Sequence, residues 1–315
     1  MMNKNERSKK EMIKKRKELA NTSSLLVIAL PGIIYLLINN YLPMFGIFLA
    51  FKDYNYVDGV FKSPWNGLKN FEYLFKQDAF MIIRNTLLYN LTFIVLGTIV
   101  AISLAILMHE LGSSKRVKFF QSSLLLPNLF SWVVVGFIGF AFLNSDTGFI
   151  NNTVIELFGL EKIAWYSEAK YWPVILTLVY LWKMMGFQSI IYMASIAGID
   201  KGIYEAAQID GASKWVQIKS ITLPMLKPTI VILSLMAVGR IFYSDFGLFY
   251  QVPMNSGAIF ETTQTIDTYV YRGLMELNDV GMSAAAGLYQ SLVGFIVVIT
   301  ANAIVRKVNN ENALF

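Results

Sequence analysis

The sequence contains no cysteine and a single histidine, His109. A disulfide, a thiolate nucleophile and a cysteine-ligated metal site are therefore excluded, and a cluster of histidine ligands cannot be built within this chain. Charged residues make up only 15% of the 315 residues, whereas soluble domains carry about a quarter. This scarcity of charge argues against a soluble globular protein.

Apolar residues account for 55% of the chain, the mean hydropathy is +0.50, and these residues occur in long continuous blocks. A membrane-spanning helix needs about 20 such residues in a row, whereas the strands of a β-barrel alternate with a period of two. The blocks therefore predict an all-α membrane protein with six transmembrane helices, near residues 25–48, 85–108, 119–143, 172–197, 225–246 and 284–305.

The formal net charge of +6 is concentrated near the N-terminus, where eight Lys or Arg occur in the first twenty residues. This clustering argues against a nucleic-acid partner. The apolar block that follows is longer than that of a signal peptide and has no small-residue cleavage site after it. Residues 1–24 are therefore expected to form a retained basic cytoplasmic segment. Met12, Ile13 and Leu19 allow it to lie on anionic membrane lipid, or it serves only as an orientation signal.

Basic residues also mark the other segments that a six-span arrangement places on the side of the N-terminus. Because Lys and Arg collect on the cytoplasmic side, both termini and the segment 200–224 are expected to be cytoplasmic. The opposite loops, 49–84, 144–170 and 247–282, mix both signs or lean acidic. The basic residues in question are Lys115, Arg116, Lys118, Lys201, Lys214, Lys219, Lys227, Arg306 and Lys307.

Two of the opposite loops, 51–75 and 144–172, are long and rich in Tyr, Phe and Trp. Loops longer than about 15 residues are usually functional or disordered, and this aromatic content argues against disorder. They form either a docking surface for a partner or an interfacial aromatic belt.

The polar segment "EAAQIDGASKWVQIKSITLPMLKP" begins at Glu205 and separates the fourth and fifth apolar blocks. Asp200 is placed to N-cap a short helix through Ala207, and Gly211 suits the left-handed position that ends it. A second short helix is expected over 212–220, and Leu223-Pro224 is expected to stop it and to start the fifth span. The result is a compact helix–turn–helix at the membrane surface.

The strings "EAAQIDGAS" and "ITLP" resemble the EAA-loop signature of binding-protein-dependent ABC importer permeases. Ile218 departs from the pattern, because many sugar permeases have an aromatic residue there. In that family the loop is the coupling helix, which docks into the cytoplasmic ATPase subunit. The resemblance assigns ATPase coupling to Glu205, Ala206, Ala207, Asp210, Gly211, Ala212, Leu223 and Pro224.

Other segments, including "LPGIIYLLINNYLPMFGIFLAFKDYN", "SPWNGLKNFEYLF" and "DFGLFYQV", look like the polysaccharide-type carbohydrate permeases of Gram-positive bacteria, within the maltose-permease superfamily. The resemblance implies an ABC importer type I permease fold and an oligosaccharide substrate. It also implies a heterodimer with a second homologous permease, two cytoplasmic ATPase subunits and an extracellular solute-binding lipoprotein.

The chain lacks a phosphate-binding G-x-x-x-x-G-K-[ST] loop. ATP and magnesium are therefore expected on the partner ATPase, with no cofactor in this chain. No set of nucleophile, base and orienting group can be assembled either, so the protein is expected to be a transport subunit and not an enzyme.

Ionisable residues inside predicted spans cost about 2.5–3.5 kcal/mol each on insertion scales, so each needs a reason. Lys183 lies midway along the fourth block, and Arg240 and Asp245 lie in the outer half of the fifth. They either face a substrate pathway or pair with one another as structural contacts. Groups suited to sugar hydroxyls and C–H faces give the remaining pathway candidates, which are Tyr180, Trp182, Gln188, Tyr192, Tyr243, Phe246, Asn128 and Gln290.

The sequence thus predicts a basic segment (1–24), a six-span permease domain (25–310) with its coupling loop at 200–224, and a tail (311–315). The predicted function is import of oligosaccharides as half of the translocation pathway. The alternatives are a permease for a peptide or amino acid and an autonomous secondary transporter.

Overall fold

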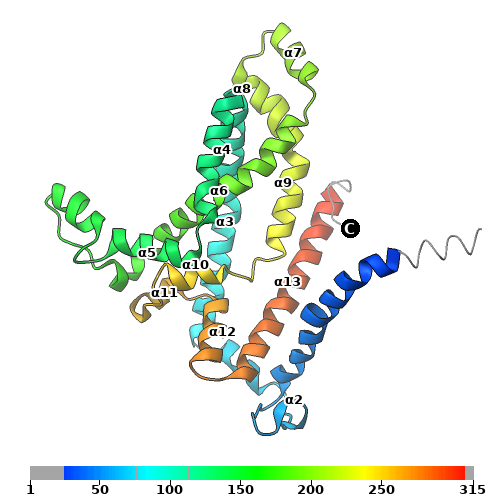
Figure 1. Cartoon of the computed structure of the whole chain (residues 1–315), viewed down its shortest axis with the longest axis vertical. Coiled ribbons are helices and arrows are strands. Elements are labelled where there is room, and N and C mark those ends of the chain that lie inside the picture. Colours follow the sequence, from blue (N-terminus) through cyan, green and yellow to red (C-terminus); the bar gives the residue numbers. More distant parts are fainter. Residues whose placement is uncertain (1–24, 76, 113, 309–315) are drawn as a thin grey trace, which may run out of the picture.

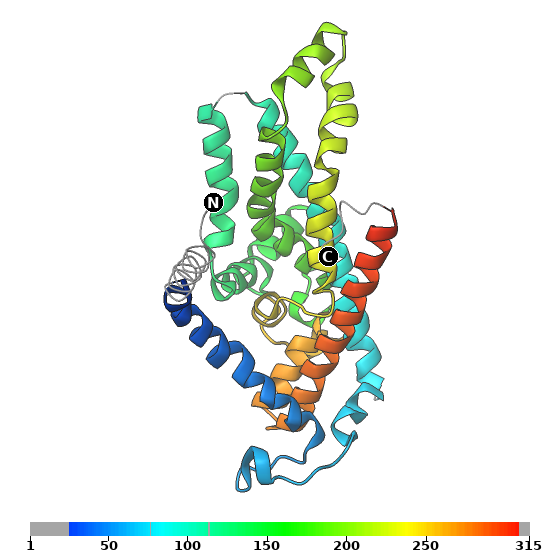
Figure 2. The same cartoon turned by 90° about the vertical axis from the view of Figure 1, so that its right-hand side faces the viewer.

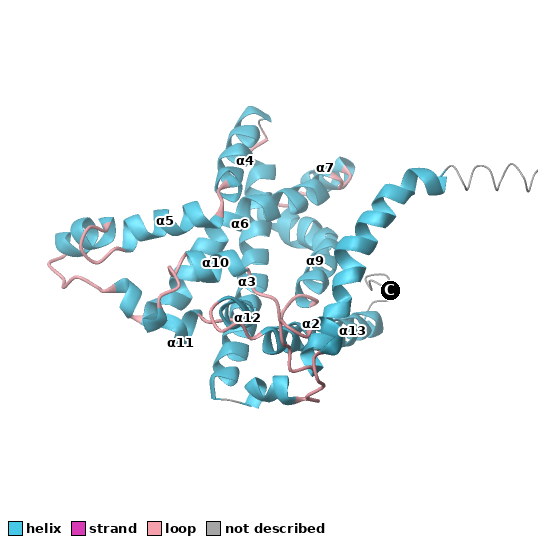
Figure 3. Ribbon diagram, turned by 60° about the horizontal axis from the view of Figure 1, so that its bottom comes forward, coloured by secondary structure: helices cyan, strands magenta, loops and turns pink. Residues whose placement is uncertain are grey.

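The computed structural model describes residues 25–75, 77–112 and 114–308. These residues form helices joined by loops, with one isolated antiparallel bridge between Lys52 and Trp65 (Figure 3). The predicted basic segment 1–24 and tail 311–315 lie outside the described residues.

The longer helices are α3 (Gln77–Glu110), α4 (Ser114–Leu129), α5 (Trp132–Leu143), α6 (Trp172–Ala197), α7 (Lys201–Ile209), α9 (Leu223–Val238), α12 (Ile266–Met275) and α13 (Val280–Val308). The shorter α-helices are α2 (Gly59–Lys62), α8 (Lys214–Gln217), α10 (Phe246–Gln251) and α11 (Phe260–Thr263). Turns of 3₁₀- or π-helix complete the chain: η1 (Leu37–Tyr41), η2 (Leu42–Phe51), η3 (Lys69–Phe75), η4 (Ile150–Ile155), η5 (Trp165–Ser167), η6 (Ala169–Tyr171), η7 (Ile218–Thr222) and η8 (Gly257–Ile259).

Five helical stretches in the described residues are long and apolar enough to cross a membrane, and α4 with α5 makes a sixth if this bent pair is counted as one span. The predicted all-α membrane architecture is confirmed. The five stretches are Leu25–Phe51, Ala79–Glu110, Ala169–Ala197, Lys214–Val238 and Val280–Lys307.

The prediction of one continuous third helix over 119–143 is wrong. The helix axis turns by 94° between α4 and α5. Pro127 lies in the last turn of α4 and has no N–H to continue the hydrogen-bond ladder. Ser131 then starts a new helix, because its hydroxyl oxygen accepts a hydrogen bond from the Val134 N–H at 3.3 Å.

The fifth span also differs from its predicted limits of 225–246. A continuous helical stretch begins at Lys214, so Leu223-Pro224 does not end a helix. The turn before Pro224 is a π-helix, in which the Leu223 N–H bonds to the Ile218 carbonyl, and this wider turn relieves the clash of the proline ring. α9 ends at Val238, so the segment 239–245 lies beyond the span.

The spans run side by side, with α7 at one end of the molecule and α2 at the other (Figures 1 and 2). The first span, Leu25–Phe51, diverges from the rest and touches α13 through η2. None of the residues in its most apolar 18-residue window is buried within the chain.

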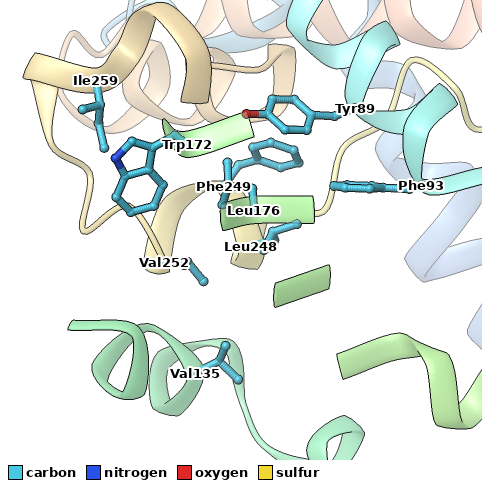
Figure 4. Close-up of a cluster of buried hydrophobic side chains, with 9 residues drawn as sticks. All are labelled: Tyr89, Phe93, Val135, Trp172, Leu176, Leu248, Phe249, Val252 and Ile259. Carbon is cyan, nitrogen blue, oxygen red and sulfur yellow. The ribbon is translucent and has the colours of Figure 1, made fainter. Parts of the chain in front are cut away.

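Four apolar clusters hold the described helices together, and two of them join the central spans. One joins α3, α5, α6 and α10 near the middle of the molecule (Figure 4), through Tyr89, Phe93, Val135, Trp172, Leu176, Leu248, Phe249, Val252 and Ile259. The other lies nearer α7 and joins α3, α6 and α9, through Ala101, Ala105, Tyr192, Ile196, Ile199 and Leu226. At the crossing of α4 and α6, a Cβ on Gly186 would lie 2.0 Å from the Leu124 carbonyl oxygen, so only glycine permits this approach.

Candidate functional site

The segment 200–224 forms the predicted helix–turn–helix at one end of the molecule. The Asp200 carboxylate accepts a hydrogen bond from the Gly202 N–H at 2.9 Å and caps α7, as predicted. Gly211 has the left-handed conformation expected of it, with φ of +79°. The Ala212 N–H bonds back to the Ala207 carbonyl at 2.8 Å and closes the end of α7.

The second helix of this segment begins at a cap that was not predicted. The Ser213 hydroxyl accepts from the Val216 N–H and starts α8, which continues through η7 into α9. Gln217 is only 3% exposed, and its amide donates to the Ala212 carbonyl at 3.0 Å. The turn between α7 and α8 is therefore fixed to the fifth span rather than free.

The coupling residues predicted between 205 and 212 lie together on this protruding turn. Glu205, Ala206, Asp210 and Gly211 are exposed, and Ala207 and Ala212 are half-buried. Leu223 and Pro224 are exposed further along the same continuous helix.

Large apolar side chains surround these residues. Ile209 is 87% exposed and Trp215 is 71% exposed. Exposed apolar side chains gathered in a polar setting are typical of an interaction surface.

Lys183 is buried, and its ammonium lies at the break between α4 and α5. It donates hydrogen bonds to the carbonyl oxygens of Pro127 at 3.3 Å, Asn128 at 3.1 Å and Phe130. The Pro127 and Asn128 carbonyls belong to the last turn of α4, which a helix end leaves without intrahelical partners, and Phe130 directly follows the helix. Lys183 therefore caps the C-terminus of α4, a structural contact that the sequence left open without naming these partners.

Trp132 connects this cap to Asp245. The Lys183 ammonium lies 4.9 Å from the centre of the Trp132 ring, within range of a cation–π interaction. The indole N–H donates to Asp245 Oδ2 at 3.0 Å, and Asp245 caps α10 by accepting from the Leu248 N–H. The structure therefore brings Lys183 and Asp245 into one network through Trp132, a residue that the sequence analysis did not single out.

Arg240 and Tyr243 lie in the non-helical segment 239–245, contrary to their predicted place in the fifth span. Arg240 is exposed, and no ion pair or side-chain hydrogen bond joins it to another of the described residues. The Tyr243 hydroxyl lies 2.8 Å from the Ser291 hydroxyl on α13. Arg240 is thus a free cation at a break in the membrane helices.

The other pathway candidates lie mainly in packing contacts. Tyr180 stacks on Phe93 with ring centres 3.9 Å apart, and Gln290 donates to the Phe242 carbonyl. Tyr192 is 3% exposed and Trp182 is 37% exposed. The remaining contacts are Asn128 to the Met184 sulfur, Gln188 to the Tyr180 hydroxyl, and Phe246 to the rings of Tyr250 and Tyr271.

A cavity of about 600 Å³ opens between α3 and α6. Leu88, Thr92, Val174 and Leu178 are among its lining residues, and Arg84 lies at one end. None of the predicted pathway residues lines it.

Buried polar side chains order the loops between α5 and α6 and between α10 and α12. The Asn151 side chain is fully buried and bonds to the backbone of Ser145 and Ile163 and to the Trp165 indole. Arg272 donates to Asn255 at 2.8 Å, and burial lowers the pKa of its guanidinium.

Residues 97–310 match the family described as binding-protein-dependent transport system inner membrane component. The chain is 34% identical over 309 residues to the polygalacturonan/rhamnogalacturonan transport system permease protein YteP of Bacillus subtilis strain 168, an alignment that covers 98% of this chain and 94% of YteP. It is 33% identical over 289 residues to protein LplB of the same organism, covering 91% and 90% of the two chains.

Among solved structures, it resembles a chain of the bacterial alginate ABC transporter in complex with a periplasmic protein that binds an alginate pentasaccharide. The TM-score is 0.83 and the identity 31%, over 93% of this chain and 97% of the other.

An all-helical membrane protein with this match is a permease of the ABC importer type. The chain belongs to the family of binding-protein-dependent transport system inner membrane components. It is a multi-pass transport subunit and not an enzyme, and family membership removes the alternative of an autonomous secondary transporter.

Proposed function

We propose that this chain is one of two permease subunits of an ATP-driven importer, and that it conducts uronate-bearing oligosaccharides. The observation that carries the proposal is the similarity, over nearly the whole chain, to permeases named for acidic polysaccharides, polygalacturonan and alginate. Arg240 supports it, because an exposed guanidinium without a partner among the described residues suits a carboxylate on the substrate.

The segment 200–224 is the coupling loop in this proposal, on the cytoplasmic side with both termini. Its protruding turn presents exposed small residues and carboxylates, together with exposed Ile209 and Trp215. ATP and magnesium bind to the ATPase subunits that receive this turn. Closure of the ATPase dimer moves the turn, and the two permeases rock between inward- and outward-facing states.

The second permease subunit packs against the first span. None of the apolar window of this 27-residue helical stretch is buried within its own chain, so its whole surface is open to contact with a second subunit. The first span reaches away from the other helices and contacts them at its Phe51 end (Figure 1). We assign the first span, Leu25–Phe51, to the heterodimer interface.

The extracellular solute-binding protein docks on the loop between α5 and α6, which projects sideways from the other helices (Figure 1). The loop ordered by Asn151 carries Leu157, Phe158 and Leu160 at exposures of 80%, 71% and 62%. An apolar tip held on an ordered loop suits a partner that docks and releases.

The substrate proposal is tested by ATP hydrolysis in the reconstituted complex. Oligogalacturonate or alginate oligosaccharides, presented by the binding protein, should stimulate hydrolysis, and neutral oligosaccharides, peptides and amino acids should not. Arg240→Gln should reduce uptake of the uronate chain about tenfold, the effect of losing one charge-assisted hydrogen bond. Arg116→Gln, which removes an exposed arginine of α4, is the matched control. Stimulation by neutral sugars alone would refute the proposal.

The coupling role is tested separately. Glu205→Lys should leave membrane insertion intact but prevent substrate-stimulated ATP hydrolysis, because it reverses a charge on the docking turn. Normal hydrolysis and uptake in this variant would show that the turn does not engage the ATPase.

A further inference from the structure

The last two residues of α3 contact both helices of the coupling loop. Lys214 Nζ, at the start of α8, lies 2.9 Å from Glu110 Oε2. The His109 ring lies 6.0 Å from the ring of Tyr204 in α7. The single histidine, for which an interfacial or structural role is expected at the end of the second span, lies at this junction.

Tyr204 fixes the same junction to the fifth span. Its hydroxyl lies 2.9 Å from the Thr222 hydroxyl. Its ring packs against the apolar cluster in which α3, α6 and α9 meet, which includes Ala105, Ile196 and Leu226. The coupling loop is thus attached at its base to three membrane helices.

Two of these helices, α6 and α9, are continuous with the loop along the chain. α3 is not, since α4, α5 and α6 lie between its end and the loop. Its direct link to the loop is therefore made by side chains, through the Glu110–Lys214 ion pair and the His109–Tyr204 contact.

The other half of α3 holds the segment that contains Arg240. The Asn90 amide donates to the carbonyls of Ile241 at 2.9 Å and Tyr243 at 3.1 Å. Asn90 and Glu110 are 20 positions apart on one continuous helix, a distance of roughly 30 Å. One rigid element therefore touches both the coupling loop and the break at 239–245.

We propose that α3 is the strut through which the coupling loop moves the segment 239–245. Glu110 and His109 receive the motion at one end, and Asn90 delivers it at the other. The inference rests on the coupling role proposed above and adds the element that carries the motion and the residues at its two contacts. These are positioning residues, which act on the pathway through other residues and do not contact the substrate.

The receiving contact is tested by reversing its charges in the reconstituted complex. Glu110→Lys and Lys214→Glu should each lower the amount of oligosaccharide transported per ATP hydrolysed by roughly two- to fivefold, the range for a partly exposed ion pair. The double variant, which restores opposite charges, should recover most of the loss. Lys219→Glu, at an exposed lysine of the same helical stretch that makes no ion pair with the described residues, is the control.

The proposal would be overturned if the double variant transported no more oligosaccharide per ATP than the weaker of the two single variants. Lys214 would then act on the ATPase and not on α3. This outcome is distinct from failure of the coupling role itself, which the Glu205→Lys variant reports.

A cross-link tests whether the two parts move together, and the cysteine-free sequence makes it practical. Glu110→Cys with Lys214→Cys should show the same partial loss of transport as the charge reversals. Joining the two thiols with a short, reducible bismaleimide should restore transport. Loss of transport on cross-linking, reversed by reduction, would show that the loop moves relative to α3 and would refute the strut.

The contact of Asn90 with the segment 239–245 predicts that ATP hydrolysis and uptake respond differently when it is lost. Asn90→Leu should leave ATP hydrolysis stimulated by the loaded binding protein but lower uptake, because the motion no longer reaches 239–245. Equal losses of hydrolysis and uptake, or no change in either, would contradict a role for Asn90 in delivery.

Discussion

Replacing Lys183 by methionine tests the cap on α4, since methionine keeps most of the side-chain volume and removes the charge. The half-buried Asn128 and Phe130 carbonyls would lose this donor, while the Pro127 carbonyl would keep its bond from the Phe130 N–H at 3.3 Å. A buried carbonyl without a partner costs about 1–3 kcal/mol. Part of this cost is offset because the ammonium no longer has to be desolvated, so we expect a net destabilisation of about 3 kcal/mol.

Such a loss corresponds to a reduction in melting temperature on the order of 5 °C for a chain of this size. The assay is thermal unfolding of the purified complex, followed by size-exclusion chromatography, together with uptake per assembled complex. Lys170→Met, which removes an exposed lysine near the start of α6, is the control and should leave the melting temperature unchanged. If Lys183→Met kept its melting temperature while uptake fell tenfold or more, Lys183 would contact the substrate and the capping role would be refuted.

Two further changes test other parts of the structure. Gly186→Ala should prevent assembly of the complex, because the added Cβ would lie 2.0 Å from the Leu124 carbonyl oxygen, and the measurement is loss of the chromatographic peak of the complex. The control is Gly287→Ala, which should be tolerated because an added Cβ there has no neighbouring atom within 4 Å. Asn151→Ala should leave assembly intact but weaken capture of the binding protein in a pull-down by about tenfold or more, because the loop would lose the bonds from this side chain to its backbone. Unchanged capture would show that the binding protein docks elsewhere.

The parts of the fold that depend on local chemistry could be predicted from the sequence. The cap at Asp200 and the left-handed turn at Gly211 follow from residue types that have few other uses in such positions. Ser213 and Asp245 carry the same kind of signal as helix caps. As helix caps, Ser213 indicates the start of α8, and Asp245 indicates a non-helical segment before α10.

The break in the third span could not be predicted in the same way. Its helices are apolar throughout, so hydropathy does not reveal a bend, and a proline alone also occurs inside continuous membrane helices such as α9. The group that stabilises the break, Lys183, belongs to another helix. Which of the predicted residues contact the substrate stays a prediction.

The cap on α4 has a consequence for how the protein is made. The Phe130 carbonyl leaves the ribosome 53 residues before the lysine that satisfies it. α5, with 12 residues and a length of roughly 18 Å, is too short to cross the bilayer by itself. The bent form of the third hydrophobic segment is therefore fully stabilised only after the fourth segment, which carries Lys183, has been inserted.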